Sequence, residues 1–391
     1  MEGFFERMKT ILAVTGIRSE YDIMSSVFKA INDHPNLNLK IVVTGAHLSH
    51  AYGMTLHEIE KDGFHIEDKV ESLINADSES SRIKGLGIQI QGLVQTVSRV
   101  KPDILLVLGD REESISTALV GSYMNIPVAH ICGGDRVVGN VDDQIRHSVT
   151  KLSHLHFASN IESAERILKL GEQPFRVFNV GNPGIDRLIT TPKLSKLKLF
   201  EQLGVNFCKT EPLLVVIQHV ISTEVDYAYE QMEQTLNAIN ELKLNCVLIY
   251  PNSDAGSQEI IRCIQDFSIS KYIHVAKNLP RIAFVNLLRH ASCLIGNSSA
   301  GILEAPALKI PVVNVGNRQK GRLCSENVSF VEHDKNAIID SINDALYDQS
   351  RIEEVKNCVN PYGDGTSSNK IAKILNEIDF NNEFLIKDIT F

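Results

Sequence analysis

The stretch SCLIGNSSAGILEAPALKIP, residues 292–311, shows the repeating unit from which the fold can be predicted. Its apolar run at 293–295 is typical of a buried strand, and the small and polar residues at 296–301 are typical of a turn. A short helix is expected at 302–308, followed by a second apolar strand at 312–315. The stretch therefore predicts a strand–turn–helix–strand unit of the α/β class.

The turn at 296–301 also suggests a place to bind an anion. The first turn of a helix has N–H groups without intrahelical partners and carries the positive end of the helix dipole. Ser298 and Ser299 would add hydroxyl donors, and Gly301 would let a phosphate approach the backbone closely. An ordinary turn with a serine N-cap is the alternative interpretation.

The same alternation continues through the rest of the chain. Strands are predicted where apolar runs end in turns, at 11–14, 39–44, 104–108, 128–132, 155–158, 175–180, 213–217, 247–250, 272–275, 293–295 and 312–315. Segments of helical spacing lie between most of these runs. Because the runs are apolar throughout, each strand should be covered on both faces, which is typical of parallel sheets between helices.

The length of 391 residues predicts two domains, and the segment 184–192 is interpreted as a hinge between them. We expect a Rossmann-like domain at 8–185 and a second one at 186–366, with the C-terminal segment 367–391 packing back on the first. Ligands of such sheets bind at the carboxyl ends of the strands. Two facing domains would therefore form an interdomain cleft.

The composition limits the classes of function. A formal net charge of −9 without a lysine- or arginine-rich tract argues against binding to nucleic acid. The seven cysteines form no C-x-x-C pair, which indicates buried thiols in a reducing cytosol rather than disulfides or a zinc site. No apolar run reaches membrane-spanning length and the charged N-terminus does not resemble a signal peptide, so we expect a cytoplasmic protein.

Three common motifs are absent from the sequence. They are the phosphate-binding G-x-x-x-x-G-K-[ST] loop, a G-x-G-x-x-G after the first strand, and the zinc-binding H-E-x-x-H. Their absence argues against an NTPase, a nicotinamide-dependent dehydrogenase and a metallohydrolase. A nucleotide-sugar site between two domains is compatible with the pattern.

Polar residues follow several predicted strands of the first half. Asp110 could act as a general base, or it could cap the helix that follows. Asp142 or Asp143 is expected to be the N-cap of the next helix. Asp143, Arg146 and His147 share one side of this helix at spacings i, i+3 and i+4. A carboxylate beside Arg and His could carry proton chemistry, and a structural ion pair is equally compatible with the spacing.

The second half offers candidates for binding. His219 ends a predicted strand, so we expect it to contact a ligand. Arg18 in the first half and Arg322 in the second could each bind two phosphate oxygens, with an exposed surface arginine as the alternative. Glu304 would repel phosphate but could accept hydrogen bonds from a ribose diol.

Seven motifs, taken together and in order, resemble one enzyme family. They are GIRSEYD (16–22), GDR (109–111), HICGGD (130–135), DDQIRH (142–147), TKLSHLHF (150–157), VGNPG (180–184) and GNSSAGILEAP (296–306). This combination resembles the hydrolysing UDP-N-acetylglucosamine 2-epimerases over nearly the whole chain. The nearest likeness is to the branch that serves sialic-acid and legionaminic-acid synthesis.

The resemblance implies a GT-B-like fold, with the active site between two Rossmann-like domains and no metal or nicotinamide cofactor. It implies that a base removes the proton at carbon 2 of the sugar and that UDP leaves by anti elimination to give a glycal. Water then adds, and carbon 2 is protonated from the other face. UDP-N-acetylglucosamine and water would give UDP and N-acetylmannosamine. The family also implies a homo-oligomer, either a dimer or a tetramer.

The resemblance assigns roles by position in these motifs. Asp110 and Asp142 match the catalytic acids of the family, and His219 matches its histidine near the diphosphate. The positions that match UDP or sugar contacts are Arg18, Asn252, Asp254, Ser298, Ser299, Glu304 and Arg322.

Cys132 departs from the family pattern, which commonly has Glu at this position. A thiol could not do the proton work of a carboxylate without a shifted pKa. Asp135, three residues further on, could take over this work, or the substrate differs. The second possibility points to UDP-2,4-diacetamido-2,4,6-trideoxyglucose, which feeds legionaminic-type acids. A GT-B glycosyltransferase and a silent UDP-sugar sensor are the alternatives of other classes.

Overall fold

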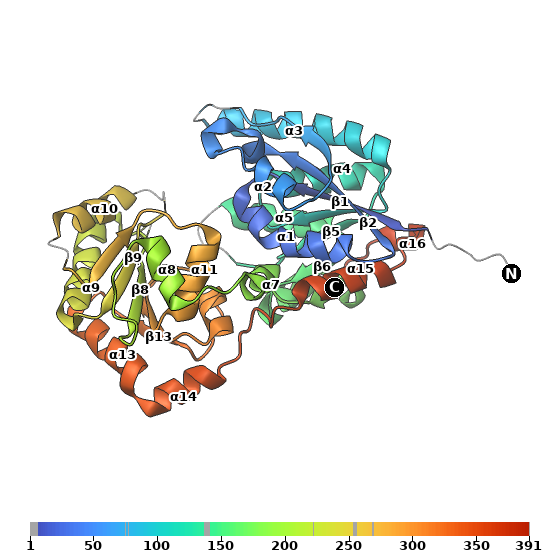
Figure 1. The fold of residues 1–391 in the computed structure, drawn as a ribbon. Helices are drawn as coiled ribbons and strands as arrows, with labels where there is room; N and C mark the ends of the chain where they lie inside the picture. Colours follow the sequence, from blue (N-terminus) through green and yellow to red (C-terminus); the bar gives the residue numbers. More distant parts are fainter. Residues whose placement is uncertain are drawn as a thin grey trace. The chain divides into compact units, whose positions relative to one another are not determined.

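The structure is a computed structural model, which describes residues 7–74, 76, 78–136, 141–221, 223–252, 256–267 and 270–390, with only the backbone described at 79 and 141. The chain divides into two compact units (Figure 1). Unit 1 holds the residues up to Arg187 together with those from Tyr362 onward, and unit 2 holds Leu188–Pro361. The chain leaves unit 1 within the helix α7 (Pro183–Thr190), so the segment interpreted as a hinge is mostly helical.

Unit 1 is built on a parallel sheet of seven strands within the described residues. In spatial order the strands are β3 (Ile66–Val70), β2 (Leu37–Thr44), β1 (Lys9–Thr15), β4 (Ile104–Leu108), β5 (Val128–Ile131), β6 (Leu155–Ala158) and β7 (Val177–Asn179). The register pairs Ala13 with Ile41 on one side and with Leu106 on the other. Every residue of β4 is buried, as expected for a strand covered on both faces.

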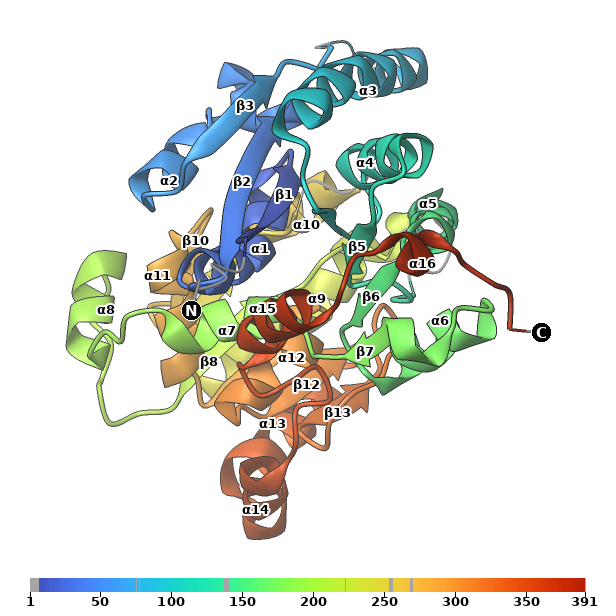
Figure 2. The ribbon, with the colours of Figure 1, turned by 90° about the vertical axis from the view of Figure 1, so that its right-hand side faces the viewer.

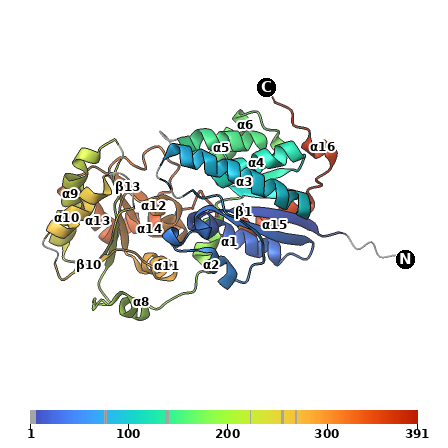
Figure 3. The same ribbon diagram turned by 90° about the horizontal axis from the view of Figure 1, so that it is seen from above.

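Helices cover both faces of this sheet (Figures 2 and 3). One face packs against α1 (Arg18–Asn32) and α15 (Ser367–Glu377), and the other against α3 (Glu79–Val100), α4 (Glu112–Met124) and α5 (Val141–Leu152). The remaining helices of this unit are α2 (Leu56–Lys61), α6 (Ile161–Lys169) and α16 (Asn382–Leu385), with 3-10 turns η1 (Gly45–Leu48), η2 (His50–Tyr52) and η3 (Pro174–Arg176).

The C-terminal segment completes the core of unit 1. Ile371 and Leu375 of α15 and Phe384 of α16 lie in the same apolar cluster as Tyr21 and Phe28 of α1. The buried Arg176 guanidinium donates to the carbonyl oxygens of Phe384 at 2.8 Å and of Ile386 at 2.7 Å. Lys387 Nζ lies 2.8 Å from Glu172 Oε2 and also donates to two carbonyl oxygens near the end of α5.

Unit 2 repeats the architecture with a parallel sheet, which has six strands in the part of the chain that the structure describes. Their spatial order is β10 (Ile273–Ala276), β9 (Asn245–Ile249), β8 (Leu213–Ile217), β11 (Cys293–Gly296), β12 (Val312–Val315) and β13 (Val328–Val331). One face packs against α9 (Ala228–Leu242), α10 (Ser257–Asp266) and α13 (Lys335–Tyr347), and the other against α8 (Lys196–Leu203) and α11 (Arg281–His290). The short α12 (Ala300–Leu303), η4 (Val225–Tyr227), η5 (Ala305–Leu308) and α14 (Gln349–Asn357) complete the unit.

Some elements differ from those predicted from the sequence. The strands β3 and β13 were not predicted, because neither is apolar throughout; β3 contains Glu67, Asp68 and Lys69. The helix expected at 302–308 is two pieces, α12 and η5. Pro306 lacks the N–H that a continuous α-helix would need there. No helix among the described residues is long and apolar enough to cross a membrane.

Candidate functional site

Each sheet has one point at which its strand order reverses, and most of the predicted site residues follow the strands at these points. The reversal lies between β1 and β4 in unit 1 and between β8 and β11 in unit 2. Doubly wound sheets bind ligands at the carboxyl ends of strands beside such a point. The turns that follow these four strands are therefore the leading candidates for a site.

In unit 1, Arg146 joins the ends of β4 and β5. Its side chain projects from α5 and is 9% exposed; it forms an ion pair with Asp110, and its Nη1 lies 3.6 Å from Asp135 Oδ2. The same Nη1 donates to the carbonyl oxygen of Cys132 at 3.2 Å. One largely buried cation therefore compensates two carboxylates and brings three of the predicted residues together.

The arrangement of α5 confirms one predicted contact and corrects another. His147 Nε2 lies 3.8 Å from Asp143 Oδ2, as the i, i+4 spacing indicates. Arg146 instead points to Asp110 and Asp135, which lie in other parts of the chain. Asp142 and Asp143 lie in the first turn of α5, which begins at Val141, so neither is the N-cap that the sequence suggested.

Asp135 is held in place by two serine hydroxyls. Ser163 Oγ donates to Asp135 Oδ1 at 2.7 Å, and Ser159 Oγ donates to the same oxygen. The second carboxylate oxygen is the one that faces Arg146. Since Gly134 has φ +74° and a Cβ there would lie 2.3 Å from the Ser163 carbonyl oxygen, the turn has no room for a larger residue at this position. The Asp135 carboxylate is thus fixed at the end of β5.

His130 lies next to Gly133 of this turn and contacts Gly109, the residue before Asp110. The ring is fully buried, and Nε2 lies 2.7 Å from the Gly109 carbonyl oxygen, so Nε2 carries the proton. Nδ1 then accepts from the Thr150 hydroxyl at 3.3 Å. Burial lowers the pKa of His130 to about 3, so the ring is neutral at physiological pH. The sequence alone does not indicate a role for His130, because its contacts are with residues that are distant along the chain.

Cys132 occupies a strained and enclosed position. It is buried, and its φ of +57° is uncommon for a residue other than glycine. Burial, together with the negative charge of Asp135, raises the pKa of the thiol well above its usual range. The thiol is therefore protonated at neutral pH and is not suited to act as a base.

Two buried carboxyl groups, which were not among the residues predicted from the sequence, surround Gly16 after β1. Glu20 Oε2 accepts from the Gly16 N–H at 2.9 Å, and Glu113 fills the space in which a Gly16 side chain would lie. Burial, and for Glu20 the charge of Glu113, raises the pKa of both groups. Burial opposes a charge on Arg111, but Glu113, Glu20, Glu112 and Asp142 raise the pKa of its guanidinium. This places Asp142 within the electrostatic reach of Arg111.

Arg18 is the first residue of α1 and follows the same turn. Its Nε lies 3.6 Å from Glu58 Oε1, and 44% of its side chain is exposed. This position at the carboxyl end of β1 is compatible with a contact to phosphate, which stays a prediction.

In unit 2, Asn297 joins the ends of β8 and β11. It is fully buried, its Oδ1 accepts from the His219 N–H at 2.7 Å, and its Nδ2 donates to the His219 carbonyl oxygen at 2.9 Å. Its own carbonyl oxygen accepts from Gln319 Nε2 at 2.9 Å and from Arg318 Nη1 at 3.3 Å. A neutral amide thus performs in unit 2 the joining role that Arg146 performs in unit 1. Asn297 belongs to the GNSSAGILEAP motif, but the sequence alone does not indicate this joining role.

The turn after Asn297 is shaped by glycine and serine. Gly296 has φ +116°, and a Cβ there would lie 2.2 Å from the Ile217 carbonyl oxygen, so a side chain is excluded. Ser298 Oγ accepts from the Ala300 N–H at 3.3 Å, and Ser299 is the N-cap of α12 without a side-chain cap. Gly301 lies within α12, next to Val312. Since α12 spans only Ala300–Leu303, its dipole contributes less than the sequence suggested.

The other predicted residues of unit 2 lie on the loops around this turn. Asn252 donates its N–H to His219 Nδ1 at 3.1 Å, which brings two of them together. Glu304 Oε1 lies 3.4 Å from Arg281 Nη1. Arg322 Nη1 donates to Gln319 Oε1 at 3.1 Å. Asp254 lies outside the described residues.

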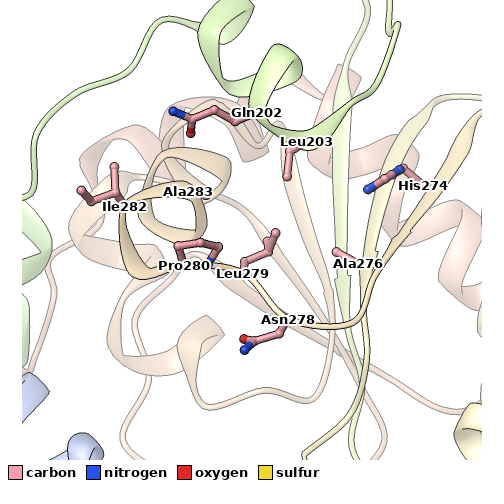
Figure 4. A pocket seen from close by; sticks show the side chains of 9 residues that line it. All are labelled: Gln202, Leu203, His274, Ala276, Asn278, Leu279, Pro280, Ile282 and Ala283. Carbon is pink, nitrogen blue, oxygen red and sulfur yellow. The ribbon is translucent and has the colours of Figure 1, made fainter. Parts of the chain in front are cut away.

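A separate cavity of about 520 Å³ lies at the edge of unit 2, between α8, the end of β10 and the start of α11 (Figure 4). Gln202, His274 and Asn278 bring polar groups to a lining that is otherwise made of residues such as Leu279 and Ile282. None of the predicted site residues that the structure describes lines it. Volume alone therefore does not identify the site, and the chemistry of the strand ends is the better guide.

Comparisons with known proteins show the family of the chain. Residues 29–376 match the family described as UDP-N-acetylglucosamine 2-epimerase. The hydrolysing UDP-N,N'-diacetylbacillosamine 2-epimerase of Legionella pneumophila is 34% identical over 97% of this chain and 99% of its own length. The UDP-N-acetylglucosamine 2-epimerase of Neisseria meningitidis is 30% identical over 94% of this chain and 95% of its own.

The fold is also shared with solved structures. A crystal structure of the Neisseria meningitidis UDP-GlcNAc 2-epimerase bound to UDP-GlcNAc has a TM-score of 0.78 and 21% sequence identity, and the match covers 94% of this chain and all of that one. This likeness confirms the predicted GT-B-like α/β fold.

Proposed function

The chain belongs to the UDP-N-acetylglucosamine 2-epimerase family, and we propose that it is a hydrolysing enzyme that releases UDP and the 2-epimer of an N-acetylated sugar. The observation that carries this proposal is the cluster of Asp110, Asp135 and Arg146 at the strand ends of unit 1. Epimerisation at carbon 2 needs one group to remove a proton and one to return it. Two carboxylates fixed beside one cation supply groups of this kind.

We assign proton transfer to unit 1. Asp110 and Asp142 are the residues proposed to act on the proton at carbon 2, and Asp135 takes the role that Glu has in the family pattern. Arg146 holds Asp110 and Asp135 in place and limits the repulsion between them. The neutral thiol of Cys132 takes no part in proton transfer.

We assign the UDP leaving group to unit 2. Ser298, Ser299 and Arg322 would donate hydrogen bonds to the diphosphate, and Glu304 would accept from the ribose. His219, held by Asn297 and Asn252, would lie near the diphosphate. Stabilising the departing diphosphate lowers the barrier to elimination, because negative charge develops there as the bond to carbon 1 breaks.

The identity of the sugar in the UDP-sugar substrate is the more specific part of the proposal. The Legionella pneumophila relative acts on UDP-N,N'-diacetylbacillosamine, which is a 2,4-diacetamido-2,4,6-trideoxyglucose, and it has the higher of the two identities compared above. The chain has Cys132 where the family commonly has Glu, with Asp135 three residues further on. This departure from the family pattern also favours the diacetylated sugar. We therefore propose the diacetylated sugar as the preferred substrate, with UDP-N-acetylglucosamine as the second candidate.

A product assay in deuterium oxide tests the reaction. The protein is incubated separately with each of the two UDP-sugars, and the products are followed by NMR. We expect release of UDP, a free sugar with inverted configuration at carbon 2, and one solvent deuterium at that carbon. UDP release with retained configuration and no deuterium would contradict the elimination mechanism, and transfer to an added acceptor would indicate a glycosyltransferase.

A further inference from the structure

Gln319 is a buried residue of the loop between β12 and β13 that none of the predicted roles includes. Its side chain is 2% exposed, although the neighbouring residues Asn317 and Lys320 are exposed. Nε2 donates to the Asn297 carbonyl oxygen at 2.9 Å, and Oε1 accepts from Arg322 Nη1 at 3.1 Å. The amide therefore connects a buried backbone group to a cation.

The two partners determine the orientation of this amide. A backbone carbonyl oxygen can only accept a hydrogen bond, and a guanidinium can only donate one. Rotating the Gln319 amide by 180° would place its oxygen against the Asn297 carbonyl oxygen and its NH₂ group against the Arg322 guanidinium. Of the common side chains, a glutamine in this orientation is one of the few that satisfies both partners without a charge.

Asn297 provides a rigid reference for this connection. Its side-chain amide exchanges two hydrogen bonds with the backbone of His219, and its own N–H donates to the Ile217 carbonyl oxygen at 3.1 Å. Asn297 directly precedes the Ser298–Ser299 turn. Its carbonyl oxygen is therefore fixed relative to that turn, and so is any group that is bonded to it.

We propose that Gln319 is a positioning residue, which fixes the guanidinium of Arg322 relative to the Ser298–Ser299 turn so that both can bind one diphosphate. This inference rests on the proposed binding of UDP by unit 2. An arginine that is already oriented loses less side-chain entropy when it binds phosphate, so the diphosphate is bound more tightly. Gln319 acts through Arg322 and not by its own contact with UDP.

A double-mutant cycle tests this role. Gln319→Met removes both hydrogen bonds at similar volume, Arg322→Met removes the cation, and the double variant combines them. Binding of UDP and of uridine is measured by calorimetry for each. We expect Gln319→Met to weaken UDP binding about tenfold and to leave uridine binding within about twofold of wild type. In the Arg322→Met background, Gln319→Met should change UDP affinity by less than about twofold.

The control is Gln265→Met on the exposed surface of α10, which should leave UDP affinity unchanged. Equal losses of UDP affinity in both backgrounds, or an equal loss for uridine, would mean that Gln319 only supports the fold, and the inference would be wrong. If Gln319→Met does not fold, Gln319→Glu replaces it. This variant keeps an acceptor for Arg322 but places an oxygen against the Asn297 carbonyl, and unchanged UDP affinity would overturn the inference.

The wild-type protein separates this failure from failure of the proposed function. If wild type does not bind UDP, the assignment of unit 2 is wrong and the positioning role falls with it. If wild type binds UDP and releases it from a UDP-sugar while the Gln319 variants bind UDP equally well, only the positioning role is wrong. A steady-state comparison adds to this test: Gln319→Met should raise KM as well as lower kcat, because Arg322 is proposed to bind the diphosphate before and during its departure.

Discussion

Arg146 in unit 1 and Asn297 in unit 2 have comparable places, since each is a buried side chain that ties the ends of two parallel strands together. Arg146 does so with a charge that compensates Asp110 and Asp135, whereas Asn297 does so with neutral hydrogen bonds to the backbone of His219. In a site that is held together by ion pairs, the attraction between the groups changes when one of them gains or loses a proton. A site held by amides keeps its shape over a wide range of pH, which suits it to bind an anion.

The largest expected effect is on turnover and comes from the charged site. Asp110→Asn keeps the shape of the side chain but cannot accept a proton, so kcat should fall by about 10²- to 10⁴-fold. UDP binding should be retained, because it is assigned to unit 2. Product release by NMR and UDP affinity by calorimetry check both parts. Asp33→Asn on the exposed end of α1 is the control, and turnover retained by Asp110→Asn would remove Asp110 from the mechanism.

The next effect is on stability and compares a buried charge with an exposed one. Arg146→Met leaves Asp110 and Asp135 without their shared cation, so the free energy of unfolding should fall by about 3 kcal/mol. The matched control is Arg99→Met, because Arg99 also pairs with two carboxylates, those of Glu67 and Asp68, but is 55% exposed. Its loss should be about 1 kcal/mol or less. If urea unfolding shows equal losses of unfolding free energy for the two variants, burial does not make the ion pairs of Arg146 more important for stability.

The third effect is a loss of stability at acidic pH, which is expected from His130 in unit 1. Burial lowers the pKa of His130 to about 3, below the value near 6.5 of an unfolded chain. As pH falls below 6.5, the unfolded state binds a proton that the folded state does not, so stability is lost on acidification. The free-energy difference between wild type and His130→Gln should shrink by about 1.4 kcal/mol for each pH unit between 6 and 4.

His130→Gln is a suitable variant because a glutamine can also donate to the Gly109 carbonyl oxygen and accept from Thr150. Unfolding of both proteins at pH 8 gives the loss that does not depend on protonation. A difference that stays constant from pH 8 to pH 4 would show that the ring titrates as it does in the unfolded chain. Burial also lowers the pKa of His274 and His333 in unit 2, so matching His→Gln variants there extend the comparison.

The smallest effect is expected at Cys132. Since the thiol is buried and protonated, and Asp135 is proposed to do the proton work, Cys132→Ser should change kcat by less than about threefold. The same assay of product release measures it. A complete loss of turnover in a variant that folds normally would implicate the thiol and would move the proton chemistry away from Asp135.

Much of the fold could be predicted because the strands are short apolar runs that end in turns. β4 and β8 are fully buried, and their sequences contain only apolar residues. β3 escaped prediction because an edge strand needs no continuous apolar run and contains charges. The turn predicted at 296–301 is limited to 297–299, because β11 ends at Gly296 and α12 begins at Ala300. Pro306 then prevents one continuous α-helix to Leu308.

The candidate site was less accessible to prediction from the sequence, because its contacts join distant positions. The spacing on α5 gives the contact of His147 with Asp143 but not the contact of Arg146 with Asp110, which are 36 residues apart. The contacts of His130 and Gln319 could not be predicted from the sequence either. Only the folded chain shows that the first is buried beneath Gly109 and that the second lies between Asn297 and Arg322.

The C-terminal segment that completes the core of unit 1 has a consequence for the order in which the protein is made. Domains usually fold as they emerge from the ribosome, the N-terminal one first. Here the core around Tyr21 and Phe28 lacks Leu375 and Phe384 until α15 and α16 have been translated. Unit 2 is continuous in sequence and can finish first. We therefore expect nascent chains that stop before α15 to carry a folded unit 2 and a protease-sensitive unit 1.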